Sequence, residues 1–159
     1  MDPIGKAPLP WPVVIIGKLS MLFCILFFIA KSYGTTMLYD SAATQLIGFL
    51  LTVAGLVFVT LGFVYLGKSV SVGLSREETE LKTQGVYRIT RNPLYFGAFF
   101  ICAGSCLYAI HFVNFLLFVL TVVIHHKIIL KEEEFLQQRF GQRWLEYRKR
   151  APRYFGIVR

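Results

Sequence analysis

Four apolar stretches, each close to the length of a bilayer-spanning helix, constrain this chain more than any other feature of its sequence. They cover residues 13–32, 43–65, 94–110 and 113–130. A helix needs about 20 mostly apolar residues to cross the hydrocarbon core. Of the 159 residues, 55% are hydrophobic and 16% are charged, which is less charge than a soluble domain carries. We therefore predict an all-α integral membrane protein, with about four transmembrane helices in a single domain spanning residues 1–159.

The charge of the loops predicts the orientation. Basic residues gather between the second and third stretches and in the C-terminal tail, at Lys68, Arg76, Lys82, Arg88, Arg91, Lys131, Arg139, Arg143, Arg148, Lys149, Arg150, Arg153 and Arg159. The opposite loops hold only Lys31. Because basic loops stay in the cytoplasm, we expect both termini there. This bias and attraction to anionic headgroups explain the net charge of +8, so no nucleic-acid partner is expected.

Helix packing can also be predicted. The third and fourth stretches are joined near residues 111–114, so they should form an antiparallel hairpin that brings Tyr95 and Glu132 to the same membrane face. Three glycines repeat every seven residues in the second stretch, at Gly48, Gly55 and Gly62. Such a stripe lets a neighbouring helix approach closely. The three cysteines lie inside apolar stretches, at Cys24, Cys102 and Cys106. We interpret them as packing residues and expect no metal site.

Three consecutive glutamates follow the fourth stretch. Successive helical residues point about 100° apart, so Glu132 shares a face with Leu136 and Phe140, whereas Glu133 points elsewhere. An acidic group beside an apolar surface suits an ammonium or sugar hydroxyls. The alternative is a solvated helix end, where glutamate pairs with a neighbouring Lys131 or Arg139.

The helical pattern continues beyond the glutamates as an apolar and aromatic stripe, formed by Leu136, Phe140, Trp144 and Tyr147. It predicts an amphipathic cytosolic helix, bent at Gly141, that lies on or caps the membrane surface.

Other side chains near the third stretch allow two interpretations each. Arg88 and Arg91 could hold a carboxylate or phosphate, or could simply belong to the cytoplasmic charge. Tyr87 and Tyr95 could stack on a purine or face a cation, or could form the aromatic belt of the interface. For His125, hydrogen-bonded packing is favoured over catalysis.

Taken together, these residues resemble the family of membrane-embedded methyltransferases that includes isoprenylcysteine carboxyl methyltransferase and the phospholipid N-methyltransferases. The family pattern is a Gly-x-Tyr turn, Arg-(His/Asn)-Pro-x-Tyr-x-Gly, a helical hairpin, Glu-Glu-x-x-Leu-x-x-x-Phe-Gly-x-x-(Tyr/Trp)-x-x-Tyr and a late proline. The matching segments here are Gly85-Val-Tyr87, Arg91-Asn-Pro-Leu-Tyr-Phe-Gly97, Glu132-Glu-x-x-Leu136, Phe140-Gly141, Trp144, Tyr147 and Pro152. The resemblance covers residues 79–154.

The resemblance implies S-adenosylmethionine as the methyl donor, in a cytosol-facing pocket closed by the C-terminal segment. A lipid or lipidated acceptor would enter laterally from the bilayer. By position, the implied cofactor-binding residues are Thr79, Glu80, Leu81, Lys82, Tyr87, Asn92, Pro93, Leu94, Tyr95 and Glu132. The resemblance also implies that Glu133 and Arg139 are catalytic residues that organise the reacting end.

Two departures from the pattern bear on the acceptor. Asn92 stands where the carboxyl methyltransferases usually have histidine, and Ile128 stands where the eukaryotic ones place a substrate-binding arginine. A carboxylate is therefore less well provided for, and O-methylation and lipid amine N-methylation both stay open. The short chain and the Asn-Pro variant favour a bacterial inner membrane over the endoplasmic reticulum. The alternative function is a non-catalytic membrane protein, an assembly or lipid-binding factor, that keeps the fold.

Overall fold

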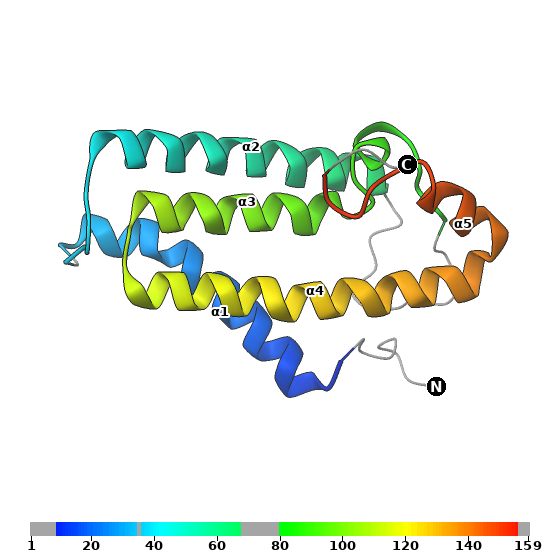
Figure 1. Ribbon diagram of the computed structural model, residues 1–159, viewed down its shortest axis with the longest axis horizontal. Helices are drawn as coiled ribbons and strands as arrows, with labels where there is room; N and C mark the ends of the chain where they lie inside the picture. Colours follow the sequence, from blue (N-terminus) through cyan, green and yellow to red (C-terminus); the bar gives the residue numbers. More distant parts are fainter. Residues whose placement is uncertain (1–8, 35, 68–79, 156–159) are drawn as a thin grey trace.

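The computed structural model describes residues 9–34, 36–67 and 80–155, and within these ranges the chain is helical. The four long helices are α1 (Trp11–Ser32), α2 (Ala42–Leu66), α3 (Pro93–Tyr108) and α4 (Phe112–Phe140). Two short elements are the 3-10 helix η2 (Gly85–Arg88) and α5 (Gln142–Arg148). In Figure 1, α3 lies between α2 and α4, and α1 crosses behind them to pack on α3 and α4. The all-α prediction is confirmed.

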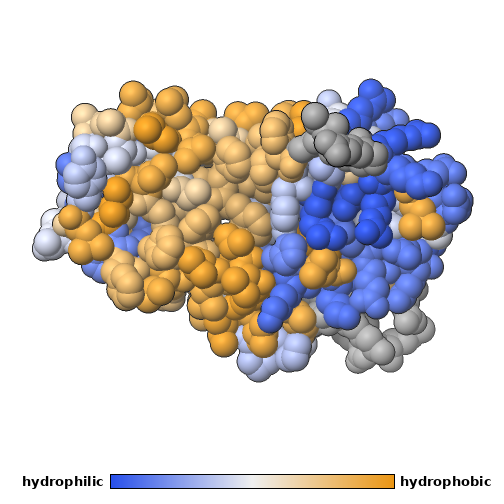
Figure 2. Space-filling view, in the orientation of Figure 1, coloured by the Kyte–Doolittle hydropathy of each residue, from blue (hydrophilic) through white to orange (hydrophobic). Residues whose placement is uncertain are grey.

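The surface of the bundle divides sharply by polarity. Figure 2 shows a hydrophobic surface over most of the length of the long helices and a hydrophilic end around α5. Large apolar side chains point outward at about half exposure, for example Ile15 at 51%, Phe49 at 57% and Phe115 at 57%. A protein in water would not leave such a continuous apolar girdle uncovered. This is therefore a membrane protein whose girdle meets lipid.

Three of the four predicted spans have the length to cross a membrane, namely α1, α2 and α4. The third predicted span was expected over residues 94–110, but α3 has only 16 residues. It ends early because the carbonyls beyond it are bonded elsewhere. The Ala109 carbonyl accepts from the Asn114 side chain at 3.1 Å, and the Ile110 carbonyl accepts from the Leu38 N–H at 2.8 Å. Sixteen helical residues extend about 24 Å.

Glycines set the close approach of α2 to α3. A Cβ added at Gly55 would lie 2.6 Å from the Gly97 carbonyl oxygen, and one added at Gly48 would lie 2.6 Å from the Gly104 carbonyl oxygen. Any larger residue would force the two backbones apart. The predicted role of the glycine stripe is confirmed, and it fixes the N-terminus of α3 beside the end of α2.

The longest helix, α4, carries the chain out of the apolar zone. Its 29 residues extend about 43 Å, more than the roughly 30 Å of hydrocarbon. The charged run that begins at Lys131 therefore lies beyond the membrane-spanning part. Gly141, with φ +51°, ends α4 and turns the chain into α5, which confirms the predicted bend.

The aromatic stripe after the bend is buried within the protein. Trp144, 2% exposed, and Tyr147 form a core cluster with Val86, Tyr87 and Ala151, against which Leu81, Leu136 and Phe140 also pack. The stripe therefore joins α5 to η2, and the prediction that it lies on the membrane surface is replaced by an internal contact at the hydrophilic end.

Candidate active site

The two polar segments singled out in the sequence meet at the hydrophilic end of the bundle. Pro93 begins α3, so Tyr95 lies in its first turn, while Glu132 lies in α4 just beyond the apolar part. The Tyr95 hydroxyl donates a 2.8 Å hydrogen bond to Glu132 Oε1. The predicted hairpin therefore brings these two residues together across 37 positions of sequence.

Glu132 is partly buried, and its partner Tyr95 packs on apolar side chains. Tyr95 packs on a cluster formed by Val14, Ile124 and Ile128, where Ile128 is 4% exposed. Burial raises the pKa of Glu132 to about 7, although the hydrogen bond from Tyr95 opposes this shift. A carboxylate that is poorly solvated and holds a single hydrogen bond attracts cations strongly, which is a common property of ligand-binding groups.

The carboxylate of the neighbouring Glu133 accepts hydrogen bonds from three side chains of the protein. Arg91 donates to Glu133 Oε1 from Nε and from an Nη at 3.1 and 3.0 Å. Arg153 donates to the other oxygen, Oε2, at 3.1 and 2.8 Å. Asn92 Nδ2 adds a fifth bond at 3.3 Å. Burial alone would raise the pKa of Glu133, but the hydrogen bonds and charge of the two arginines outweigh burial and lower it.

The C-terminal segment is attached through this same network. The Pro152 carbonyl accepts from the Arg91 N–H at 2.9 Å, and the Arg153 carbonyl accepts from the Thr90 hydroxyl at 2.9 Å. Tyr154 Oη lies 2.7 Å from His126 Nδ1. Thus the segment passes from α5 back over the start of α3 to α4. It covers Thr90 and Arg91, which precede α3.

Tyr87 and Leu81 lie in the cluster between η2 and α5. The Tyr87 carbonyl accepts a 2.7 Å hydrogen bond from the Tyr147 hydroxyl. Both predicted residues therefore lie on the loop wall of this end, which α5 holds in place.

The remaining predicted residues are more dispersed. Glu80 and Lys82 form an ion pair of 2.7 Å with the Glu80 side chain exposed. Leu94 points at α2, where it contacts Gly62 and so packs two helices together. Arg139 lies against the Phe140 ring, two turns beyond Glu132 on α4. Thr79 lies outside the described residues.

Two residues were not recognised in the sequence as members of the site. Arg91 was considered as a ligand for an anion, yet its guanidinium is bound to Glu133 and to the carbonyls of Arg148 and Ala151. Arg153 was one of several basic residues in the tail. The position of Arg153 one residue after the late proline was the available signal. No group of three potential metal-binding side chains occurs among the described residues.

Comparison with known proteins covers this whole region. A family model described as phospholipid methyltransferase matches residues 43–143, from the start of α2 into α5. The protein-S-isoprenylcysteine O-methyltransferase B of Arabidopsis thaliana is 28% identical over 138 residues, which make up 84% of this chain and 70% of that relative. Both matches include the α3–α4 hairpin with Tyr95, Glu132 and Glu133.

Proposed function

Because this chain belongs to the phospholipid methyltransferase family, and is thus a membrane methyltransferase, we propose that it uses S-adenosylmethionine to methylate a lipid or lipidated acceptor. The observation that carries the proposal is the hydrogen bond between Tyr95 and Glu132. The Glu132 carboxylate in this pair has few hydrogen-bond partners and lies where the hydrophilic end meets the apolar girdle. The family favours this proposal over a non-catalytic assembly or lipid-binding factor.

The negative charge of Glu132 complements the positive charge of the proposed cofactor. S-adenosylmethionine, when bound, supplies a methyl group that is already activated on a sulfonium. Glu132 in its ionised form offers a negative charge with which no cationic side chain of the described residues forms an ion pair. Tyr95 orients that carboxylate, and the adjoining cluster of Tyr87 and Leu81 excludes water from the loop side. Among the other implied residues, Asn92 and Pro93 shape the start of α3, Leu94 packs α3 on α2, and Glu80 and Lys82 contribute an exposed rim.

We assign Glu133 a positioning role within the site. It holds Arg91 and Arg153, and through them the start of α3 and the C-terminal segment, in one arrangement. Reactions of an activated donor depend mainly on the alignment of the acceptor, so this rigidity serves catalysis. Arg139 extends the site along α4, toward the outermost part of the acceptor.

The acceptor would reach Glu132 from the bilayer. Ile128 and its neighbours Val14 and Ile124 provide an apolar wall one turn before Glu132. Such a wall suits a lipid chain and offers no guanidinium for a carboxylate. An amine acceptor must be neutral to attack, so it also requires a proton acceptor, whereas a carboxylate does not. We propose that the hydrophilic end faces the cytoplasm of a bacterial inner membrane.

Calorimetric titration of the detergent-purified protein with S-adenosylhomocysteine tests the proposal. We expect saturable binding that Glu132→Ala removes and that Glu134→Ala preserves, since Glu134 is an exposed carboxylate paired with Lys131. Equal binding by the two variants would reject the site. Absence of binding by a folded wild-type protein would reject the cofactor. Once binding is established, transfer of a labelled methyl group to lipid extracts identifies the acceptor.

A further inference from the structure

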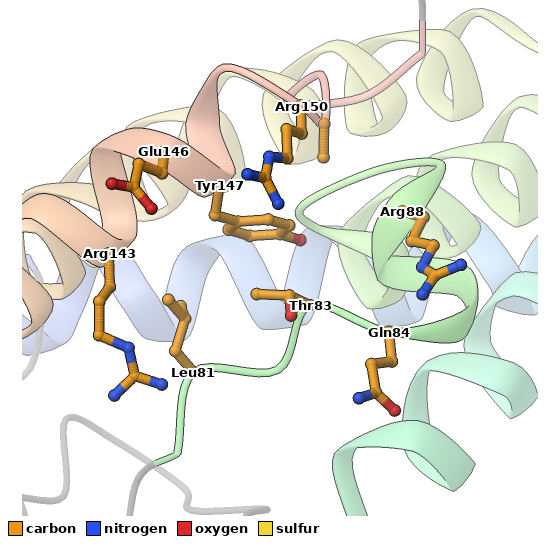
Figure 3. Close-up of a pocket in the computed structure, with 9 residues that line it drawn as sticks. Leu81, Thr83, Gln84, Arg88, Arg143, Glu146, Tyr147 and Arg150 are labelled. Carbon is orange, nitrogen blue, oxygen red and sulfur yellow. The ribbon is translucent and has the colours of Figure 1, made fainter.

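A cleft lies at the hydrophilic end, between the loop that leads into η2 and the region of helix α5 (Figure 3). Its volume is about 510 Å³. The lining residues are Leu81, Thr83, Gln84, Arg88, Arg143, Glu146, Tyr147, Arg150 and Ala151. Among the described residues implied to bind the cofactor, Leu81 lines this cleft, whereas the Tyr95–Glu132 pair does not.

The cleft is strongly basic. The lining includes Arg88, Arg143 and Arg150 together with Glu146, so it carries three positive charges and one negative charge. Within the part of the chain that the structure describes, none of these three arginine side chains makes an ion pair or a side-chain hydrogen bond. By contrast, Arg91 and Arg153 both form ion pairs with Glu133.

The general cytoplasmic bias toward basic residues does not account for this arrangement. That bias requires positive charge on one side of the membrane and is satisfied by residues anywhere on that side. Here three arginines from two elements, η2 and the α5 region, line one cleft. A basic concavity concentrates positive potential and so attracts anions more strongly than a flat surface does.

The walls of the cleft are held in place and offer further donors. The Tyr147 hydroxyl is bonded to the Tyr87 carbonyl, which fixes the ring that Figure 3 shows among the three arginines. Thr83 and Gln84 add a hydroxyl and an amide on the opposite wall. Guanidinium groups present two parallel donors whose geometry matches the oxygens of a phosphate.

We propose that this cleft binds a phosphate-bearing anion through Arg88, Arg143 and Arg150. The phosphate could belong to a lipid headgroup at the cytoplasmic surface or to a small soluble molecule. The site is separate from the carboxylate Glu132, and its occupation does not depend on the proposed methyl donor.

The chain offers a matched pair of variants. Arg143→Gln with Arg150→Gln removes two charges from the cleft, while Arg148→Gln with Lys149→Gln removes two charges from exposed neighbours that do not line it. Glu146→Gln removes the opposing charge. Calorimetric titrations use the detergent-purified full chain at physiological salt, with inorganic pyrophosphate in one arm and short-chain phosphatidic acid in the other.

We expect saturable binding in at least one arm, which also identifies the source of the phosphate. The cleft pair should weaken it by about tenfold or more, and the neighbouring pair by less than about threefold, because charge-assisted hydrogen bonds in the cleft are stronger than the screened attraction of exposed charges outside it. Glu146→Gln should tighten it. Absence of binding in both arms, or equal weakening by the two pairs, would overturn the proposal. A normal S-adenosylhomocysteine titration in the same samples separates that failure from failure of the proposed function.

Discussion

Two adjacent carboxylates on α4 have opposite surroundings. Glu133 accepts five hydrogen bonds from Arg91, Arg153 and Asn92, and its side chain is 9% exposed. Glu132, on another face of the helix, accepts a hydrogen bond from Tyr95, whose ring packs on apolar side chains. The pKa of Glu133 is lowered, and the pKa of Glu132 is raised to about 7 by burial.

This contrast assigns a structural role to Glu133 and a ligand-binding role to Glu132. A buried charge with a full set of partners holds elements together, and it has no capacity left for a ligand. A partly buried charge with few partners is costly for the fold unless a ligand completes it. We therefore expect substitutions at Glu133 to act mainly on stability and substitutions at Glu132 to act mainly on binding.

The largest effect should follow from Glu133→Ala. It leaves the guanidinium groups of Arg91 and Arg153 without their anion in a largely buried place, and breaking such a pair costs about 3–5 kcal/mol. Thermal unfolding in detergent, followed by tryptophan fluorescence, measures the change. The control is Glu134→Ala, which removes an exposed ion pair and should cost less than about 1 kcal/mol. Equal stability of the two variants would show that Glu133 is not the link between the elements.

A smaller loss of stability is expected from Arg153→Ala. Glu133 keeps its bonds from Arg91, and the Arg153 side chain is already 30% exposed, so we expect a cost of about 1.5–3 kcal/mol. The same unfolding measurement applies. A loss as large as that of Glu133→Ala would mean that the C-terminal segment, and not Arg91, carries most of the connection.

The pH dependence of cofactor binding tests the other carboxylate. Glu132 must be ionised to hold a cation such as the α-ammonium group, which S-adenosylmethionine and S-adenosylhomocysteine both carry. Because its pKa is raised to about 7, affinity should be high above pH 7 and should fall as the pH drops through that value. The fall should approach tenfold, or about 1.4 kcal/mol, per pH unit. Titrations with S-adenosylhomocysteine from pH 8 to pH 6 measure it. Glu132→Gln should give a weak and flat profile, and a flat profile for the wild type would contradict the assigned role.

The smallest effect is expected from Tyr95→Phe, which removes one hydrogen bond from Glu132 and keeps the ring. A single hydrogen bond contributes about 0.5–1.5 kcal/mol, so affinity for S-adenosylhomocysteine should fall about two- to tenfold. Tyr154→Phe is the matched control, since it removes a hydroxyl from the Glu133 side, where Tyr154 contacts His126. The contrast between the two carboxylates would lose its basis if both tyrosine variants weakened binding equally.

The sequence predicts the helices and their pairing well because those depend on local patterns. Apolar length locates the spans, Gly55 and its repeats locate a close contact, and the short turn at residues 111–114 brings Tyr95 to Glu132. The bend at Gly141 follows from its backbone freedom. These features need no knowledge of distant contacts.

The partners of Glu133 could not be predicted in the same way. Arg153 is one of several arginines in the tail, and only the folded path of the C-terminal segment distinguishes it. The aromatic stripe of Trp144 and Tyr147 is equally consistent with a membrane surface and with an internal contact, and the presence of η2 decides between them. The sequence predicts an end for the third span that lies beyond the observed end of α3. The reason is that the Asn114 side-chain amide donates a hydrogen bond to the Ala109 carbonyl across the turn.

The shortness of α3 has a consequence for how the protein reaches the membrane. With about 24 Å of helix, α3 falls short of the roughly 30 Å of hydrocarbon, and its glycine face is complementary to α2. Inserted alone, it would leave polar backbone at its ends in contact with lipid. We expect α3 to be retained at the insertion machinery until α2 or α4 accompanies it, so that the catalytic half of the chain enters the bilayer as one assembled unit.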